Sequence, residues 1–92
     1  MVNQQSRETF DTGLKKIRLE IKSRLVPHGL FGSVTETDMG GDAGRTGATI
    51  VITGKGRTSS RSFDRKQIED CHLRVSGTVL LTVTAMIDEL AV

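Results

Sequence analysis

Five large apolar residues near the N-terminus recur at a spacing that constrains the fold more than any other feature of the sequence. They are Phe10, Leu14, Ile17, Ile21 and Leu25. Steps of three and four residues place these side chains on one face of an α-helix. Pro27 and Gly29 end the pattern, because proline cannot continue a helix and glycine favours its termination. We therefore predict an amphipathic helix over residues 6–26, whose apolar face must be buried.

The middle of the chain has the pattern of short β-strands. Residues 30–37 are rich in β-branched side chains, and residues 48–53, Ala-Thr-Ile-Val-Ile-Thr, are the clearest strand pattern of the chain. The glycine-rich residues 38–47 predict a connection between the two strands. The sequence Gly54-Lys55-Gly56 favours a tight hairpin turn, because glycine adopts positive φ readily. Residues 57–63 then form the returning strand, and their scarcity of apolar side chains places it at a sheet edge.

The C-terminal third fits two patterns. Asp64 and Gln67 have the spacing of a capping box, which predicts a short helix. Residues 72–85 then alternate apolar with polar side chains and are rich in Val and Thr, which predicts a long strand. A helix over residues 77–91 is the alternative, because an apolar set there also has helical spacing. We expect the strand.

These elements predict a single α+β domain over residues 1–92. A long N-terminal amphipathic helix packs on an antiparallel sheet of three or four strands, and the C-terminal segment is a strand or, alternatively, a helix. The second face of the sheet is left to solvent or to a partner.

With a helix over residues 77–91, the order of elements is similar to that of a known family. The order helix, strand, strand, strand and final helix resembles the layout of double-stranded-RNA-binding domains. The last helix of that family begins with a lysine-rich segment, whereas Ser76-Gly77-Thr78-Val79 stands at this place here. The resemblance is therefore one of topology, and it implies no binding residue in this chain.

Few residues could carry catalysis or hold a cofactor. Cys71 and His72 are adjacent, and adjacent side chains on a strand point to opposite faces, so they cannot form a nucleophile–base pair there. Two histidines and one cysteine without zinc spacing predict no metal site. Gly54-Lys55-Gly56 lacks the spacing of a phosphate-binding loop. We predict no enzyme activity, no catalytic residue, no cofactor and no small-molecule substrate.

Composition favours association with another protein surface. Only 36% of the residues are apolar and 3% aromatic, so the core of this chain is thin and a partner could cover part of its apolar surface. A single cysteine cannot form an internal disulfide, and the sequence has no segment apolar enough for a signal or a membrane span. We expect a cytoplasmic protein with no membrane partner.

A basic segment suggests another kind of partner. In an extended chain, one face carries Lys55, Arg57, Arg61, Phe63 and Arg65. Cations around an exposed ring could neutralise phosphates and stack an unpaired base. The same residues could instead keep an edge strand soluble, with Phe63 in the core. A second basic stripe, Lys15, Arg18 and Lys22, has helical spacing outside the apolar face of the N-terminal helix.

Together these observations predict a small non-catalytic interaction domain that binds another protein or itself. The alternative is a small nucleic-acid-binding module that uses the basic hairpin.

Overall fold

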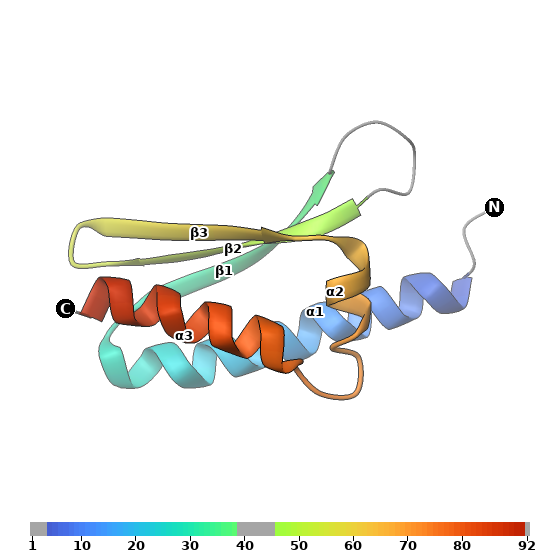
Figure 1. Cartoon of the computed structure of the whole chain (residues 1–92), viewed down its shortest axis with the longest axis horizontal. Coiled ribbons are helices and arrows are strands. Elements are labelled where there is room, and N and C mark those ends of the chain that lie inside the picture. The colour runs from blue at the N-terminus through green and yellow to red at the C-terminus, as the bar shows by residue number, and fades with distance from the viewer. Residues whose placement is uncertain (1–3, 39–45, 92) are drawn as a thin grey trace.

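The computed structural model describes residues 4–38 and 46–91 (Figure 1). Its elements are, in chain order, α1 (Gln4–Leu25), the 3₁₀ turn η1 (Val26–His28), β1 (Phe31–Asp38), β2 (Thr46–Gly54), β3 (Arg57–Phe63), α2 (Arg65–Glu69) and α3 (Gly77–Ala91). The strands form one antiparallel sheet in the order β1-β2-β3. Both long helices lie on the same side of this sheet, so the fold is an α+β arrangement of two layers.

The amphipathic helix predicted at residues 6–26 is confirmed as α1. All five residues of its apolar stripe are buried, and α1 packs against β1 and α2. Gly13 lies at the contact with α2, where a Cβ atom would overlap the backbone carbonyl group of Ile68. Glycine at this position therefore permits a close approach of the two helices, and a larger residue would separate them.

The hairpin between β2 and β3 has the turn predicted from its sequence. Lys55 and Gly56 both have positive φ, 55° and 75°, as a two-residue type I′ turn requires. The turn pairs Gly54 with Arg57 and sets the register of the two strands. β3 is at the sheet edge, as its polar sequence predicts. Most of the glycine-rich connection predicted at residues 38–47 lies outside the described residues.

The strand predicted at residues 72–85 is wrong, because the C-terminal segment forms helix α3. Its buried residues are Val79, Val83, Met86, Ile87 and Leu90. Leu73 and Leu81, which belong to the alternating pattern, are exposed. The helix buries its apolar side chains against β2 and β3 on a sheet face that α1 leaves open. Tertiary burial therefore selects the helical pattern over the alternating one.

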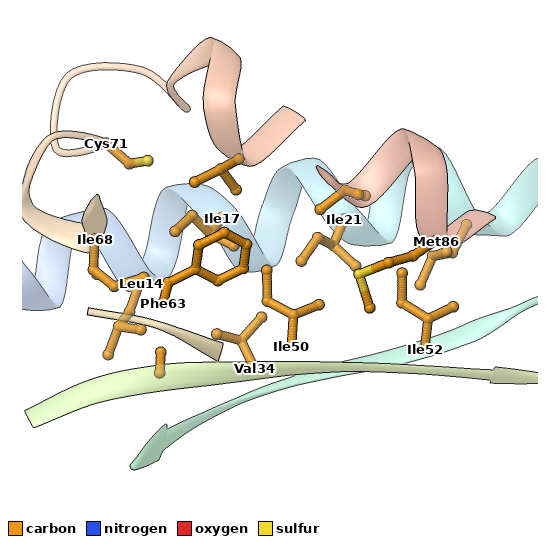
Figure 2. Packing of buried hydrophobic residues seen from close by; sticks show 14 of the residues in the cluster. Leu14, Ile17, Ile21, Val34, Ile50, Ile52, Phe63, Ile68, Cys71 and Met86 are labelled. Atoms are coloured by element: carbon orange, nitrogen blue, oxygen red, sulfur yellow. The ribbon is translucent and has the colours of Figure 1, made fainter. Parts of the chain in front are cut away.

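The core lies between the two layers (Figure 2). Ile50 and Ile52 of β2 point toward the helices, and Ile17 of α1 and Met86 of α3 meet them there.

The capping box predicted at the start of the short helix α2 is also confirmed. Asp64 accepts a hydrogen bond from the Gln67 backbone N–H, and the Gln67 side chain accepts one from the Asp64 N–H. After the three strands, the chain therefore ends in two helices, the short α2 and the longer α3.

Candidate functional site

The residues of the predicted basic surface turn toward the helices. Arg57, Arg61 and Phe63 alternate with solvent-facing residues of β3, so they share one face as predicted. That face is the one that α3 covers. Phe63 is 4% exposed and belongs to the core, so the expectation of an exposed ring for base stacking is wrong. Its position opposite Ala48 of β2, on the helix side of the sheet, explains the burial.

The cations of the hairpin bind the end of α3. Arg57 donates hydrogen bonds to the carbonyl oxygens of Glu89 and Leu90, and Lys55 Nζ lies 3.4 Å from the carbonyl oxygen of Ala91. Arg61 forms an ion pair of 3.0 Å with the Glu89 carboxylate, which also accepts a hydrogen bond from Ser59. The negative end of a helix attracts cations. These side chains therefore join the hairpin to α3.

Arg65 also forms contacts within the chain. It lies in α2, pairs with Glu69, and its guanidinium lies 5.6 Å from the centre of the Phe10 ring. Arg7 approaches the same ring at 5.4 Å and also bridges to Glu36 of β1. Each of the five predicted nucleic-acid-binding residues thus has a structural role, while nucleic-acid binding itself stays a prediction.

A groove lies between α1 and β1. Its volume is about 720 Å³. Its lining residues come from the second half of α1, η1 and the first half of β1: Arg18, Ile21, Lys22, Leu25, Val26, Gly29, Leu30, Phe31, Gly32, Ser33 and Val34. Two of these are large apolar side chains in solvent, since Phe31 is 77% exposed and Val26 is 67% exposed. A contiguous apolar surface of this kind is typical of an interaction site.

The widths of the two layers explain why a groove forms here. Three strands about 4.8 Å apart form a sheet roughly 14 Å wide, whereas two helices of about 10 Å diameter form a layer roughly 20 Å wide. α3 packs against β3 and β2, and α1 packs against β1 at the opposite edge. The helical layer is therefore wider than the sheet and extends past β1 by roughly 3 Å.

The outer edge of β1 turns backbone groups toward this groove. Because the turn pairs Gly54 with Arg57, alternation along β2 directs the amide groups of Ile52 and Ile50 to β3. Their partners in β1, Gly32 and Val34, consequently direct their own N–H and C=O groups away from the sheet. Hydrogen-bonding groups for an additional strand are thus available at the groove.

Arg18 protects part of this edge. Its Nη2 and Nε atoms lie 3.0 Å and 3.3 Å from the carbonyl oxygen of Val34. A cationic side chain over an edge carbonyl discourages uncontrolled strand pairing. Gly32 lies nearer the centre of the groove, and because it is a glycine, it has no side chain that could cover its own N–H and C=O groups. Gly32 also allows Ile21 and Leu25 to approach, because a Cβ atom would overlap both.

The two charged residues that line the groove, Arg18 and Lys22, are both basic, while Glu36 farther along β1 interacts electrostatically with Arg18. Of the stripe identified from helical spacing, Lys15, Arg18 and Lys22, the last two line the groove, and Lys15 is exposed one turn before Arg18. Within residues 4–38 and 46–91, none of the three forms a salt bridge. Among the described residues, no acidic side chain lines the groove. A ligand with negative charge is therefore favoured at this position.

The open face of the sheet is uncharged and rich in hydroxyl groups. Alternation and register place on it Phe31, Ser33, Thr35, Thr37, Thr49, Val51, Thr53, Thr58, Ser60 and Ser62. Several hydroxyls satisfy one another across strands: Thr49 Oγ1 lies 2.9 Å from Thr37 Oγ1 and 3.1 Å from Ser62 Oγ. Phe31 is the corner at which this face meets the groove.

The groups that could act in catalysis lie apart from one another. Cys71 is buried, and its Sγ lies 3.4 Å from the carbonyl oxygen of Gln67, whereas His72 is exposed. Among the described residues, no three His, Cys, Asp or Glu side chains gather as a metal site would require. No helix of the described segments is long and apolar enough to cross a membrane.

One carboxyl group of the described structure has a clearly displaced pKa. Hydrogen bonds from Arg7 to Glu36, 2.6 Å and 3.2 Å long, hold the pKa of the Glu36 carboxyl below its ordinary value. The partner, Arg7, lies near the start of α1, so the ion pair joins this helix to the C-terminal half of β1.

Comparison with known proteins supplies no relative: no protein family, no curated protein and no solved structure matches the chain.

Proposed function

We propose that this chain is a non-catalytic protein-interaction domain whose binding site is the groove between α1 and β1. The observation that carries the proposal is the exposure of Phe31 and Val26 beside an apolar groove at an open sheet edge. Interfaces between proteins are enriched in aromatic residues and depleted of charge at their centre. The uncharged sheet face that adjoins Phe31 extends this character.

The geometry favours a different protein over a second copy of this chain. If two copies paired through their β1 edges, each α1 would lie in the space beneath the partner's β1. Strands pair about 4.8 Å apart, whereas packed helices need 8–10 Å, so the two α1 helices would overlap. The open sheet face offers roughly 300 Å² by strand spacing and length, well below the roughly 800 Å² per partner of a standard interface.

Sedimentation equilibrium over a wide concentration range separates these alternatives. We expect a monomer at every concentration. A dimer that dissociates when Phe31 is changed to Ser would replace the proposal with self-association through the same groove.

A library of random peptides displayed on phage tests the binding site without assuming a sequence. Selection on the immobilised chain should enrich particular peptides, and these should lose binding to Phe31→Ser. Leu81→Ser is the matched control, because Leu81 is equally exposed but lies on α3. If no peptide is enriched, or if enriched peptides bind Phe31→Ser as well as the unmodified chain, the groove is not a protein-binding site.

A further inference from the structure

We infer that the groove takes an extended, acidic segment of another protein, which lies beside β1 as a fourth strand and directs carboxylate groups toward Arg18 and Lys22. This inference rests on the proposed function and specifies the chemistry of the partner.

The backbone of β1 supplies the recognition of an extended chain. Gly32 directs both its N–H and its C=O outward, and Val34 directs its N–H to the same side. An added strand gains main-chain hydrogen bonds from such groups regardless of its sequence. Because the residue at the centre is a glycine, Ile21 and Leu25 of α1 pack directly against the helix side of this edge and form its apolar floor.

The dimensions of the groove favour a strand over a helix. The overhang of the helical layer beyond β1, roughly 3 Å, is closer to the width of one strand, about 4.8 Å, than to the width of a helix, which is at least 10 Å across with its side chains. The lining runs from Arg18 of α1 to Val26 at the start of η1, which is roughly 12 Å at 1.5 Å per residue. At about 3.3 Å per residue, this length accommodates roughly four residues of an extended chain.

The lining predicts the side chains of the added strand. Every second residue of that strand would face α1. Near Phe31 and Gly32, it would meet Leu25 and Val26, where an apolar side chain is favoured. Near Val34, it would meet Arg18, where a carboxylate is favoured.

Arg18 gives the site a defined response to its ligand. In the structure, its guanidinium satisfies the Val34 carbonyl oxygen. A carboxylate on the added strand is a stronger acceptor for a guanidinium than a carbonyl oxygen. The ligand would therefore draw Arg18 from Val34 and leave this oxygen for a main-chain N–H of the added strand.

Two fluorescein-labelled peptides of the same backbone test the inference. One has the sequence Thr-Val-Thr-Val-Thr-Glu-Thr-Glu, and its matched partner carries Lys in place of each Glu. Anisotropy titration should show that the Glu peptide binds roughly tenfold more tightly than the Lys peptide, and that added salt reduces the difference. Lys22→Glu should reverse the preference, whereas Lys66→Glu on α2 should leave it unchanged.

Amide hydrogen exchange on the complex tests the strand geometry. The Gly32 and Val34 N–H groups should exchange at least tenfold more slowly when the Glu peptide is bound, while the Ser60 N–H at the other edge of the sheet should not change. Equal affinity of the two peptides would overturn the charge assignment, and unprotected Gly32 and Val34 would overturn the strand. If neither peptide binds but phage selection yields peptides that require Phe31, the inference fails and the proposed function stands. If selection also yields none, both fail.

Discussion

Arg57 of β3 donates a hydrogen bond of 2.8 Å to the main-chain carbonyl oxygen of Glu89 in the last turn of α3. The last turn of a helix has carbonyl oxygens without intrahelical donors and a partial negative charge. α3 has no basic residue of its own in this turn. Many helices have a basic residue in their own last turn. In α3 this cation comes instead from Arg57 of the hairpin, which is distant in the sequence.

Replacement of Arg57 by Ala should destabilise the domain by about 1 kcal/mol, because the helix loses both the charge and the hydrogen bonds at its C-terminus. Chemical denaturation monitored by circular dichroism measures the change. Arg74→Ala is the control, since Arg74 is an exposed cation in the loop before α3, and it should change stability by less than about 0.5 kcal/mol. Equal effects of the two substitutions would contradict the capping role.

Ile17→Ala should lower the free energy of unfolding by roughly 2–5 kcal/mol, because Ile17 is fully buried and its removal leaves a cavity. Leu19→Ala removes a side chain of similar size from the same helix, but Leu19 is 69% exposed, so its effect should stay within about 0.5 kcal/mol. Thermal or urea denaturation of both variants provides the test. A similar loss from both would mean that α1 does not pack as described.

Gly13→Ala should destabilise the domain although alanine is the better helix former. The added methyl group would overlap the carbonyl oxygen of Ile68. Because this oxygen belongs to the backbone, it cannot rotate away as a side chain could. Gly77→Ala at the start of α3 is the control, because no atom lies within 4 Å of the position of its Cβ, and it should be neutral or slightly stabilising. Denaturation curves in which Gly13→Ala is the more stable variant would refute the close α1–α2 contact.

The ion pair of Arg7 with Glu36 should make a small contribution to stability that depends on pH. Because the pKa of Glu36 is lower in the folded chain, the contribution is present above the pKa of the unfolded state and is lost as the pH falls through the folded pKa. In Arg7→Gln, the Glu36 pKa should rise toward its ordinary value, as followed by carboxyl carbon chemical shifts in NMR. An unchanged titration would show that Arg7 does not bind Glu36 in solution.

Local sequence determined the elements whose signals do not depend on distant residues. The stripe from Phe10 to Leu25 specifies α1, because only a helix brings those side chains to one face. Lys55-Gly56 specifies the hairpin turn, because both residues have to adopt positive φ. The pairing of Asp64 with Gln67 specifies the start of α2. Each of these predictions is confirmed because its physical cause lies within a few residues.

Only the tertiary structure decided the C-terminal segment and the role of the basic residues. Leu81 fits the alternating pattern and Leu90 the helical one, and the choice depends on which side chains the sheet can bury beside α1. Alternation along the strand correctly placed Arg57 and Phe63 on one face of β3. It could not show that the helices cover this face, because that depends on how the two layers pack. The groove has the same origin, since it arises from the unequal widths of a two-helix layer and a three-stranded sheet.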